Sequence, residues 1–302
     1  MWFKNLQIFR LPAPFKVDIE QLNSQLATQA FSQCPSNEMQ SEGWASPREN
    51  EQLIHSVNQQ LLLLLSTEKK LLPSSIINQV AKAKAAELEE QQGFAPGRKA
   101  MKDLKERVID ELLPRAFGIK RSTWVWIDPV NGWLVIDSSS PSKADDVIKL
   151  LLKCTKLPLE SLRVKLSPQT AMTDWLLADE APKGFTIDQD TELRSHTEDK
   201  ATVRYVNHSL DADDVQRHIA AGKLCTKLAL TWNDRVSFVL TESLALKRIK
   251  ALDILDEDKE SRTNNEDERF DADFVLMTSE LATMMDDLVF ALGGEMESLK
   301  AA

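Results

Sequence analysis

The pattern of apolar and polar residues alternates between strand-like and helix-like periods along the chain. Residues 2–11, WFKNLQIFRL, and the aliphatic run 61–65 predict two strands. Between them, residues 18–31 place apolar side chains near one face at helical spacing, and Asp18 is suited to be the N-cap of that helix. The chain therefore begins as a mixed α and β protein.

The middle of the chain predicts a helical hairpin between strands. Pro73 breaks the preceding strand, and the serines at 74 and 75 can cap a helix over about 76–92. GFAPG at 93–97 then breaks the pattern. A second helix should run from about 98 to 113 and end at Pro114, because proline disfavours helical geometry in the residue before it. The segment thus predicts a projection inserted into an α+β body.

Two strand pairs follow the hairpin. Residues 123–137 read as two strands joined by a turn at Asn131-Gly132, and residues 227–243 read as two strands joined by a turn at Asn233-Asp234. Both turn pairs accept positive φ. The segments after them, 142–156 and 244–255, read as helices. A polar stretch at 256–269 predicts a flexible loop, and residues 271–294 predict a long helix stopped by two glycines.

Composition adds few constraints. The 302 residues allow one large or two to three small domains, and 42% hydrophobic with 28% charged residues is ordinary for a globular protein. No apolar run approaches a membrane span, and no secretion signal opens the chain, so we expect a cytoplasmic protein. Three isolated cysteines, Cys34, Cys154 and Cys225, fit a reducing compartment and read as small hydrophobic residues.

Charge becomes informative when the chain is divided. The net charge of −10 is distributed as −3 over residues 1–68, +5 over 69–121, −2 over 122–249 and −10 over 250–302. The basic block coincides with the predicted hairpin. Such asymmetry suggests a surface for a polyanion, although a charge run can also be only a solvated face.

The basic residues of the second hairpin helix are segregated from its acidic residues. On a helical wheel, Arg98, Lys102 and Lys105 flank the apolar stripe, and the carboxylates lie on the far side. A helix facing nucleic acid needs this separation. The alternative is a solvated amphipathic helix in which Lys102 pairs with Glu106. No aromatic ladder interleaves with the basic groups, so contact with the phosphate backbone is the mode they favour.

No catalytic motif is present in the sequence. Walker, GxGxxG, HExxH and GxSxG patterns are absent, and the four histidines are scattered. Acidic groups could still hold Mg²⁺ in a nuclease; they are Asp256, Glu257, Asp258, Asp271 and Asp273.

Several segments in order resemble the recombination-associated protein RdgC family. They are MWFKNLQIFRL at the start, Gly43-Trp44, LLPRAF at 112–117, WID with NG at 126–132, AGKLCTKLALTW at 221–232, LKRIK at 246–250 and RFDADFVLMTSELA at 269–282. The resemblance runs from the first residues to Gly294.

The resemblance implies a cytoplasmic, nucleoid-associated protein that forms a homodimeric ring around double-stranded DNA, without sequence preference, and restrains RecA-mediated recombination. It implies no enzyme activity and no cofactor or metal. The implied domains are a central domain at 1–73 and 118–168, a helical tip at 74–117 and a base at 169–302, with the place of 270–294 open.

The resemblance also directs attention to particular residues. Those expected to face DNA are Lys82, Lys84, Arg98, Lys99, Lys102, Lys105, Arg204, Lys223, Lys227, Lys247, Arg248 and Lys250. Phe117, with Arg115 beside it, matches the aromatic at the gate of the ring. After Arg204 the chain continues with uncharged residues and His208 where relatives tend to be basic, so the strength of binding is open. The alternatives are the metal-dependent nuclease and an acidic module that mimics DNA.

Overall fold

The computed structural model describes residues 2–48, 50, 52–195, 200–208, 212–252 and 265–296. Within these ranges the fold is α+β, with seven α-helices and a 12-stranded sheet whose strand pairs are antiparallel. The strands are β1 (Asn5–Arg10), β2 (Gln40–Ala45), β3 (Ile54–Val57), β4 (Gln60–Lys70), β5 (Gly118–Asp128), β6 (Trp133–Asp137), β7 (Glu160–Ser161), β8 (Phe185–Ser195), β9 (Thr202–Tyr205), β10 (Lys223–Trp232), β11 (Val236–Thr241) and β12 (Leu246–Ala251). The helices are α1 (Ile19–Ala27), α2 (Ser74–Gln92), α3 (Arg98–Leu112), α4 (Pro141–Cys154), α5 (Pro168–Ala178), α6 (Ala212–Ala220) and α7 (Glu266–Ala291).

One sheet runs through both halves of the chain, the first half containing β1 to β7 and the second half β8 to β12. Its order is β2-β4-β5-β6-β1-β12-β11-β10-β8-β9, with β3 beside β4 and β7 beside β1. The halves join where β1 pairs with β12, through Asn5 opposite Lys247 and Leu6 opposite Leu246. Hydrogen bonding is therefore continuous across the junction, while the domain boundaries expected from the sequence remain a prediction.

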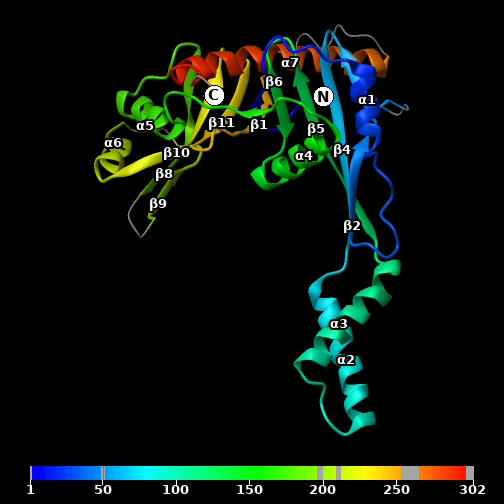
Figure 1. Ribbon diagram of the computed structural model, residues 1–302. Helices are drawn as coiled ribbons and strands as arrows, with labels where there is room; N and C mark the ends of the chain where they lie inside the picture. The colour runs from blue at the N-terminus through cyan, green and yellow to red at the C-terminus, as the bar shows by residue number, and fades with distance from the viewer. Residues whose placement is uncertain are drawn as a thin grey trace, which may run out of the picture.

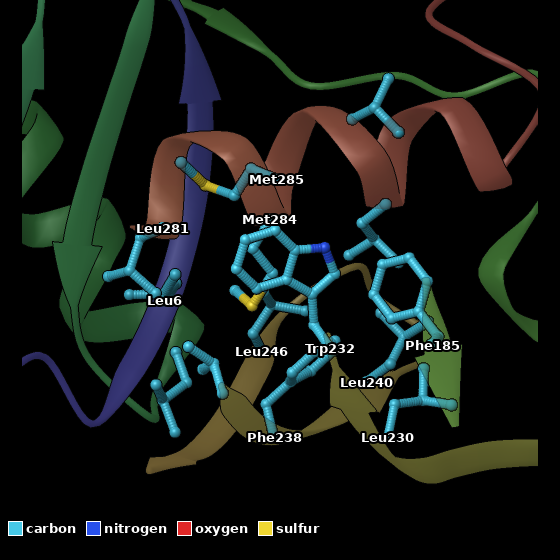
Figure 2. Packing of buried hydrophobic residues seen from close by; sticks show 14 of the residues in the cluster. Leu6, Phe185, Leu230, Trp232, Phe238, Leu240, Leu246, Leu281, Met284 and Met285 are labelled. Carbon is cyan, nitrogen blue, oxygen red and sulfur yellow. The ribbon is translucent and has the colours of Figure 1, made fainter. Parts of the chain in front are cut away.

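Helix α7 lies along one face of this sheet (Figure 1). Its buried side chains, among them Phe274, Met277 and Leu281, pack with residues of both halves, from Leu62 and Trp126 to Leu228 and Leu240. Figure 2 shows Trp232 of β10 beside Met284 of the helix. The Trp232 indole N–H also donates to a carboxylate oxygen of Asp287 on α7, at 2.8 Å.

The opposite face is covered only in part. The buried residues packed against α7 form the first apolar cluster. A second apolar cluster, which includes Leu61 and Leu63, lies under α1 and α4. Along β4, β5 and β6 the residues of the two clusters alternate. As predicted, the Asp18 carboxylate caps α1, accepting from the backbone N–H of Gln21 at 3.0 Å. The alternation of buried residues on these central strands places one core on each side of the sheet.

Helices α2 and α3 follow one another between β4 and β5 and project away from the sheet on the side opposite α7 (Figure 1). Small and aliphatic residues, Ala81 and Ala85 of α2 with Leu104 and Val108 of α3, form the buried contact. The turn between the helices begins at Gly93, whose φ of 78° suits a residue without a side chain.

Several predictions need correction. The helix predicted at 244–255 is wrong where the structure describes it, because residues 246–251 form strand β12, paired with both β11 and β1. High helix propensity is overridden there by sheet pairing. The residue that caps α2 is Pro73, and no side chain caps that helix.

The polar loop predicted at 256–269 lies largely outside the described residues. Its last part is wrong, since α7 already begins at Glu266, where the Asn265 side chain accepts from the backbone N–H of Asp267 at 3.0 Å. The second hairpin predicted from Asn233-Asp234 is confirmed, and both residues have positive φ.

Replacing Phe274 with alanine tests the role of α7 in joining the halves. This side chain is fully buried, so Phe274→Ala should lower the free energy of unfolding by about 3–5 kcal/mol. Phe290, on the same helix but 83% exposed, provides the matched control, and Phe290→Ala should change little. Denaturant unfolding measures both, and equal losses from the two variants would contradict this packing.

Candidate nucleic-acid interface

The strands of the second half expose a basic face opposite α7. Helices α5, α6 and α7 contribute their buried residues to the first cluster, on the other side of these strands. Pairing places Lys227 opposite Thr241, Lys247 opposite Val239 and Lys250 opposite Ser237, and these three β11 residues alternate with its core residues. The three lysines therefore project from one face, which we call the basic sheet face.

A buried carboxylate organises the end of this face nearest β9. Glu192, 2% exposed, accepts from Lys227 at 2.8 Å and from the guanidinium of Arg204, and Arg194 lies 3.1 Å from its other oxygen. Burial alone would raise the pKa of Glu192, but hydrogen bonds from Lys227, Arg204 and Thr226 outweigh it and lower the pKa to about 2. Glu192 thus stays ionised and partly neutralises Arg204 and Lys227.

A small pocket of about 250 Å³ opens between these residues and β12. Arg248 lines it from a position with φ of 55°, at an irregularity in the pairing of β11 with β12. Its guanidinium lies 3.4 Å from Asp190, and its side chain is largely exposed. Lys247, which also lines the pocket, and Lys250 form no ion pair among the described residues. These two lysines are therefore available to an anionic ligand.

The predicted cations of the helical hairpin form a separate group. Lys84 pairs with Glu111 across the two helices, and Lys102 lies 3.7 Å from Glu106 as the solvated-helix alternative required. The ion pair with Lys84 lowers the pKa of Glu111. Lys82 and Arg98 are exposed, and Lys105 is half-buried. The structure thus places the twelve predicted residues in two groups on different parts of the molecule.

The charges at the far end of the hairpin oppose the dipoles of their own helices. Arg98 and Lys99 occupy the first turn of α3, whereas Glu89 and Glu90 occupy the last turn of α2. The N-terminus of a helix favours anions and the C-terminus favours cations, so these charges do not stabilise the helices that carry them.

The predicted gate residues lie at the root of the hairpin. Arg115 is in the single turn after α3, and Phe117 follows it, with its carbonyl accepting from the backbone N–H of Leu71 at 2.7 Å. The Phe117 ring is 83% exposed. A second exposed aromatic, Phe94, lies in the turn at the opposite end of α2. Sequence reasoning had not singled out Phe94.

Three cations that the sequence did not assign to a site converge beside α4. Lys69 of β4, Arg121 of β5 and Lys143 of α4 line a pocket of about 510 Å³. Arg121 belongs to the basic block that the charge count identified, but only the pairing of β4 with β5 reveals that it shares a face with Lys69. This convergence depends on tertiary structure and has no local sequence signal.

The acidic residues considered for a nuclease do not form a metal site in the described part of the chain, where no three potential ligands come together. Asp271 lies 2.8 Å from His55 and near Arg48, so it serves to attach α7 to the segment before β4. Asp256, Glu257 and Asp258 fall outside the described residues. The cysteines are free thiols, and burial raises the pKa of Cys225 to about 12.

Of the helices that are described, none is long and apolar enough to cross a membrane.

Residues 1–295 match the family model described as "Putative exonuclease, RdgC". The chain belongs to the RdgC family. It is 66% identical over 298 residues to the recombination-associated protein RdgC of Janthinobacterium sp. (strain Marseille), covering 98% of this chain and 99% of that protein. It is also 66% identical to the protein of the same name from Herminiimonas arsenicoxydans, over 98% of this chain and 99% of that one, and 60% identical to that of Paraburkholderia phymatum, over the full length of both.

Membership of the RdgC family associates the chain with recombination. The relatives are named for that association and not for an enzyme activity, while the family description mentions an exonuclease. The names alone therefore leave catalysis open.

Glu192 predicts a specific dependence of stability on pH. Its folded pKa of about 2 lies below the ordinary 4.5, so its contribution is complete above about pH 5 and is lost as the pH falls towards 2. Glu192→Gln should lower the free energy of unfolding by about 2 kcal/mol near neutral pH, and the difference from the parent should shrink at acid pH.

The exposed Glu106 provides the control for this measurement, since Glu106→Gln should leave the pH dependence unchanged. A constant difference between parent and Glu192→Gln from pH 7 to pH 2 would contradict the assignment.

Proposed function

We propose that this protein is a sequence-independent double-stranded DNA-binding protein that acts as a homodimeric ring and restrains RecA-mediated recombination by occupying the duplex. The observation that carries the proposal is the basic sheet face, on which Lys247 and Lys250 have no ion pair among the described residues. An acidic protein can bind a polyanion when its positive charge is segregated in this way.

The chemistry of the face favours contact with phosphates. Lys227 lies on β10 and Lys247 and Lys250 lie on β12, with β11 between them, so these cations are spread over a sheet surface and not carried by a helix that could enter a groove of DNA. Phosphate contacts position a protein on DNA but carry no sequence information. Binding through this face should therefore be independent of sequence.

The outline of the chain supports a ring. In Figure 1 the α2–α3 pair and the end of β8 and β9 both project on the side away from α7, so that the chain forms an arch. A second copy facing the first would close the arch into a ring, with one contact at the hairpins and another at the opposite ends. The basic sheet face would then line the opening.

The proposal gives the hairpin cations a secondary role. Lys84 and Lys102 are already paired with carboxylates, whereas Arg98 and Lys99 form no ion pair within the described ranges and can attract DNA or meet acidic residues of a second copy. Phe117, exposed at the root of the hairpin, is proposed as the gate residue, with Arg115 beside it. Location in the nucleoid follows from DNA binding.

The salt dependence of duplex binding tests the role of the basic sheet face. If about six phosphates are neutralised, the logarithm of the binding constant should fall against log[salt] with a slope of about −5. Lys247→Glu with Lys250→Glu should weaken binding to all sequences alike by about tenfold or more, and reduce the slope.

Arg269→Glu is the matched control because Arg269 is exposed on α7, on the far side of the sheet. A flat salt response, or equal losses from the control, would refute the proposed surface. The same gels run with Mg²⁺ separate binding from cleavage, since shortening of the labelled duplex would favour the nuclease instead.

Replacing Phe117 tests the gate. Phe117→Ser should weaken the dimer and shorten the lifetime of complexes on covalently closed DNA by about tenfold, because an exposed aromatic anchor is lost. Light scattering and salt-challenge assays measure the two effects. Phe290→Ser removes an equally exposed ring from another part of the molecule. If Phe117→Ser behaves like the parent in both assays, Phe117 is not the gate.

A further inference from the structure

A pocket with both apolar and basic lining residues lies between the β4–β5 strand pair and α4. Strand pairing sets Thr67 opposite Arg121 and Lys69 opposite Ile119 on the face that carries the second apolar cluster. Val147 and Lys143 of α4 close the other side. Its volume of about 510 Å³ falls in the range of ligand-binding pockets. We call it the ribbon pocket.

The walls of the ribbon pocket combine two kinds of group. Leu65 and Val147 form a buried apolar floor, and Leu71 and Ile119 are aliphatic side chains left exposed at its edge. Aliphatic groups exposed around a concave site often mark a place of contact with a partner. The pocket can therefore bury an apolar side chain of a ligand.

The lining of the ribbon pocket carries a net positive charge. Lys69, Arg121 and Lys143 form no ion pair among the described residues, and Lys70 adds a fourth cation. The two carboxylates of the lining are Glu42 and Asp146, and Asp146 already lies 3.6 Å from Lys149. Lys143 also belongs to the first turns of α4, where the helix dipole favours anions. The pocket thus attracts negative charge.

We propose that the ribbon pocket binds a short acidic peptide segment of a partner protein, one that places an aliphatic side chain on the floor and carboxylates against Lys69, Arg121 and Lys143. This inference goes beyond the proposed DNA binding and does not rest on it. Charge complementarity supplies the attraction and the apolar floor supplies the selectivity.

Duplex DNA fits the ribbon pocket less well. A double helix is far too wide to enter it and could touch only the cations at its edge, leaving the apolar floor unused. A phosphate backbone also gains nothing from Leu65 and Val147, whereas an aliphatic side chain does. The aromatic platform that would stack an unpaired base is missing from the lining.

Titration with synthetic peptides tests the ribbon pocket. The probe is a short fluorescent peptide of aspartates ending in a pair of leucines, and its counterpart has the leucines replaced by serines. The full-length protein should bind the leucine peptide saturably and the serine peptide about tenfold more weakly, as measured by anisotropy. Equal binding of the two peptides would show general attraction to a basic surface and overturn the proposal.

Variants locate the binding. Arg121→Ala with Lys143→Ala should weaken the leucine peptide by about tenfold, and Leu71→Ser should weaken it by removing apolar contact. Lys120→Ala is the matched control, because Lys120 neighbours Arg121 on β5 but projects from the opposite face, over the ring of Phe31. Equal loss from Lys120→Ala, or no saturable binding to the parent, would overturn the proposal.

A short duplex serves as the competitor. The peptide site should survive an excess of duplex, and the Arg121 and Lys143 variant should keep most of its affinity for duplex through the basic sheet face. If the variant loses peptide and duplex alike and duplex displaces the peptide fully, the pocket is part of the DNA surface and the proposal is wrong. This outcome leaves the proposed DNA function standing, so the two failures are distinguishable.

Discussion

The burial of α7 against one face of the continuous sheet is the interaction on which the rest of the structure depends. Its apolar residues contact both halves of the chain, and Trp232 adds a hydrogen bond to Asp287. Because β1 and β12 pair beneath it, the sheet needs no separate interface between its halves. One face is thereby covered in both halves, whereas α1 and α4 cover the other only in part and leave cations exposed on it.

The partly covered face divides into two chemically different parts. Near β10 and β12, cations lie opposite Ser237, Val239 and Thr241 of β11, and a buried glutamate fixes the geometry of Arg204 and Lys227. Near β4 and β5, cations surround an apolar floor under α4. A cationic sheet surface suits a stiff polyanion, whereas a pocket with an apolar floor suits a flexible chain. The same sheet can thus offer two surfaces without overlap.

Much of the fold could be predicted from the sequence, because strongly periodic segments and turn pairs determine local structure. The α1 cap at Asp18, the hairpin at Asn233-Asp234 and the helical pair 74–112 follow from short-range signals. The segment of β12 was mistaken for a helix, since Leu, Lys and Ala favour helices and only its two neighbouring strands decide otherwise. The residues of β9 could not be assigned to an edge strand before their pairing with β8 was known.

The candidate site was predictable in its residue types and not in its arrangement. Lys247 and Lys250 stood out as basic residues, but their common face depends on the irregular pairing around Arg248. Glu192 gave no signal at all, because its importance comes from burial among three cations. Lys69, Arg121 and Lys143 are far apart in the sequence and meet only in the folded chain.

Lysine reactivity with and without duplex DNA tests the central claim most directly. Mass spectrometry after brief acylation would report each lysine of the full-length protein separately. The account predicts that duplex protects Lys227, Lys247 and Lys250, while Lys183, in the turn between α5 and β8, stays as reactive as before. Protection of Lys183 together with full reactivity of Lys247 and Lys250 would contradict it.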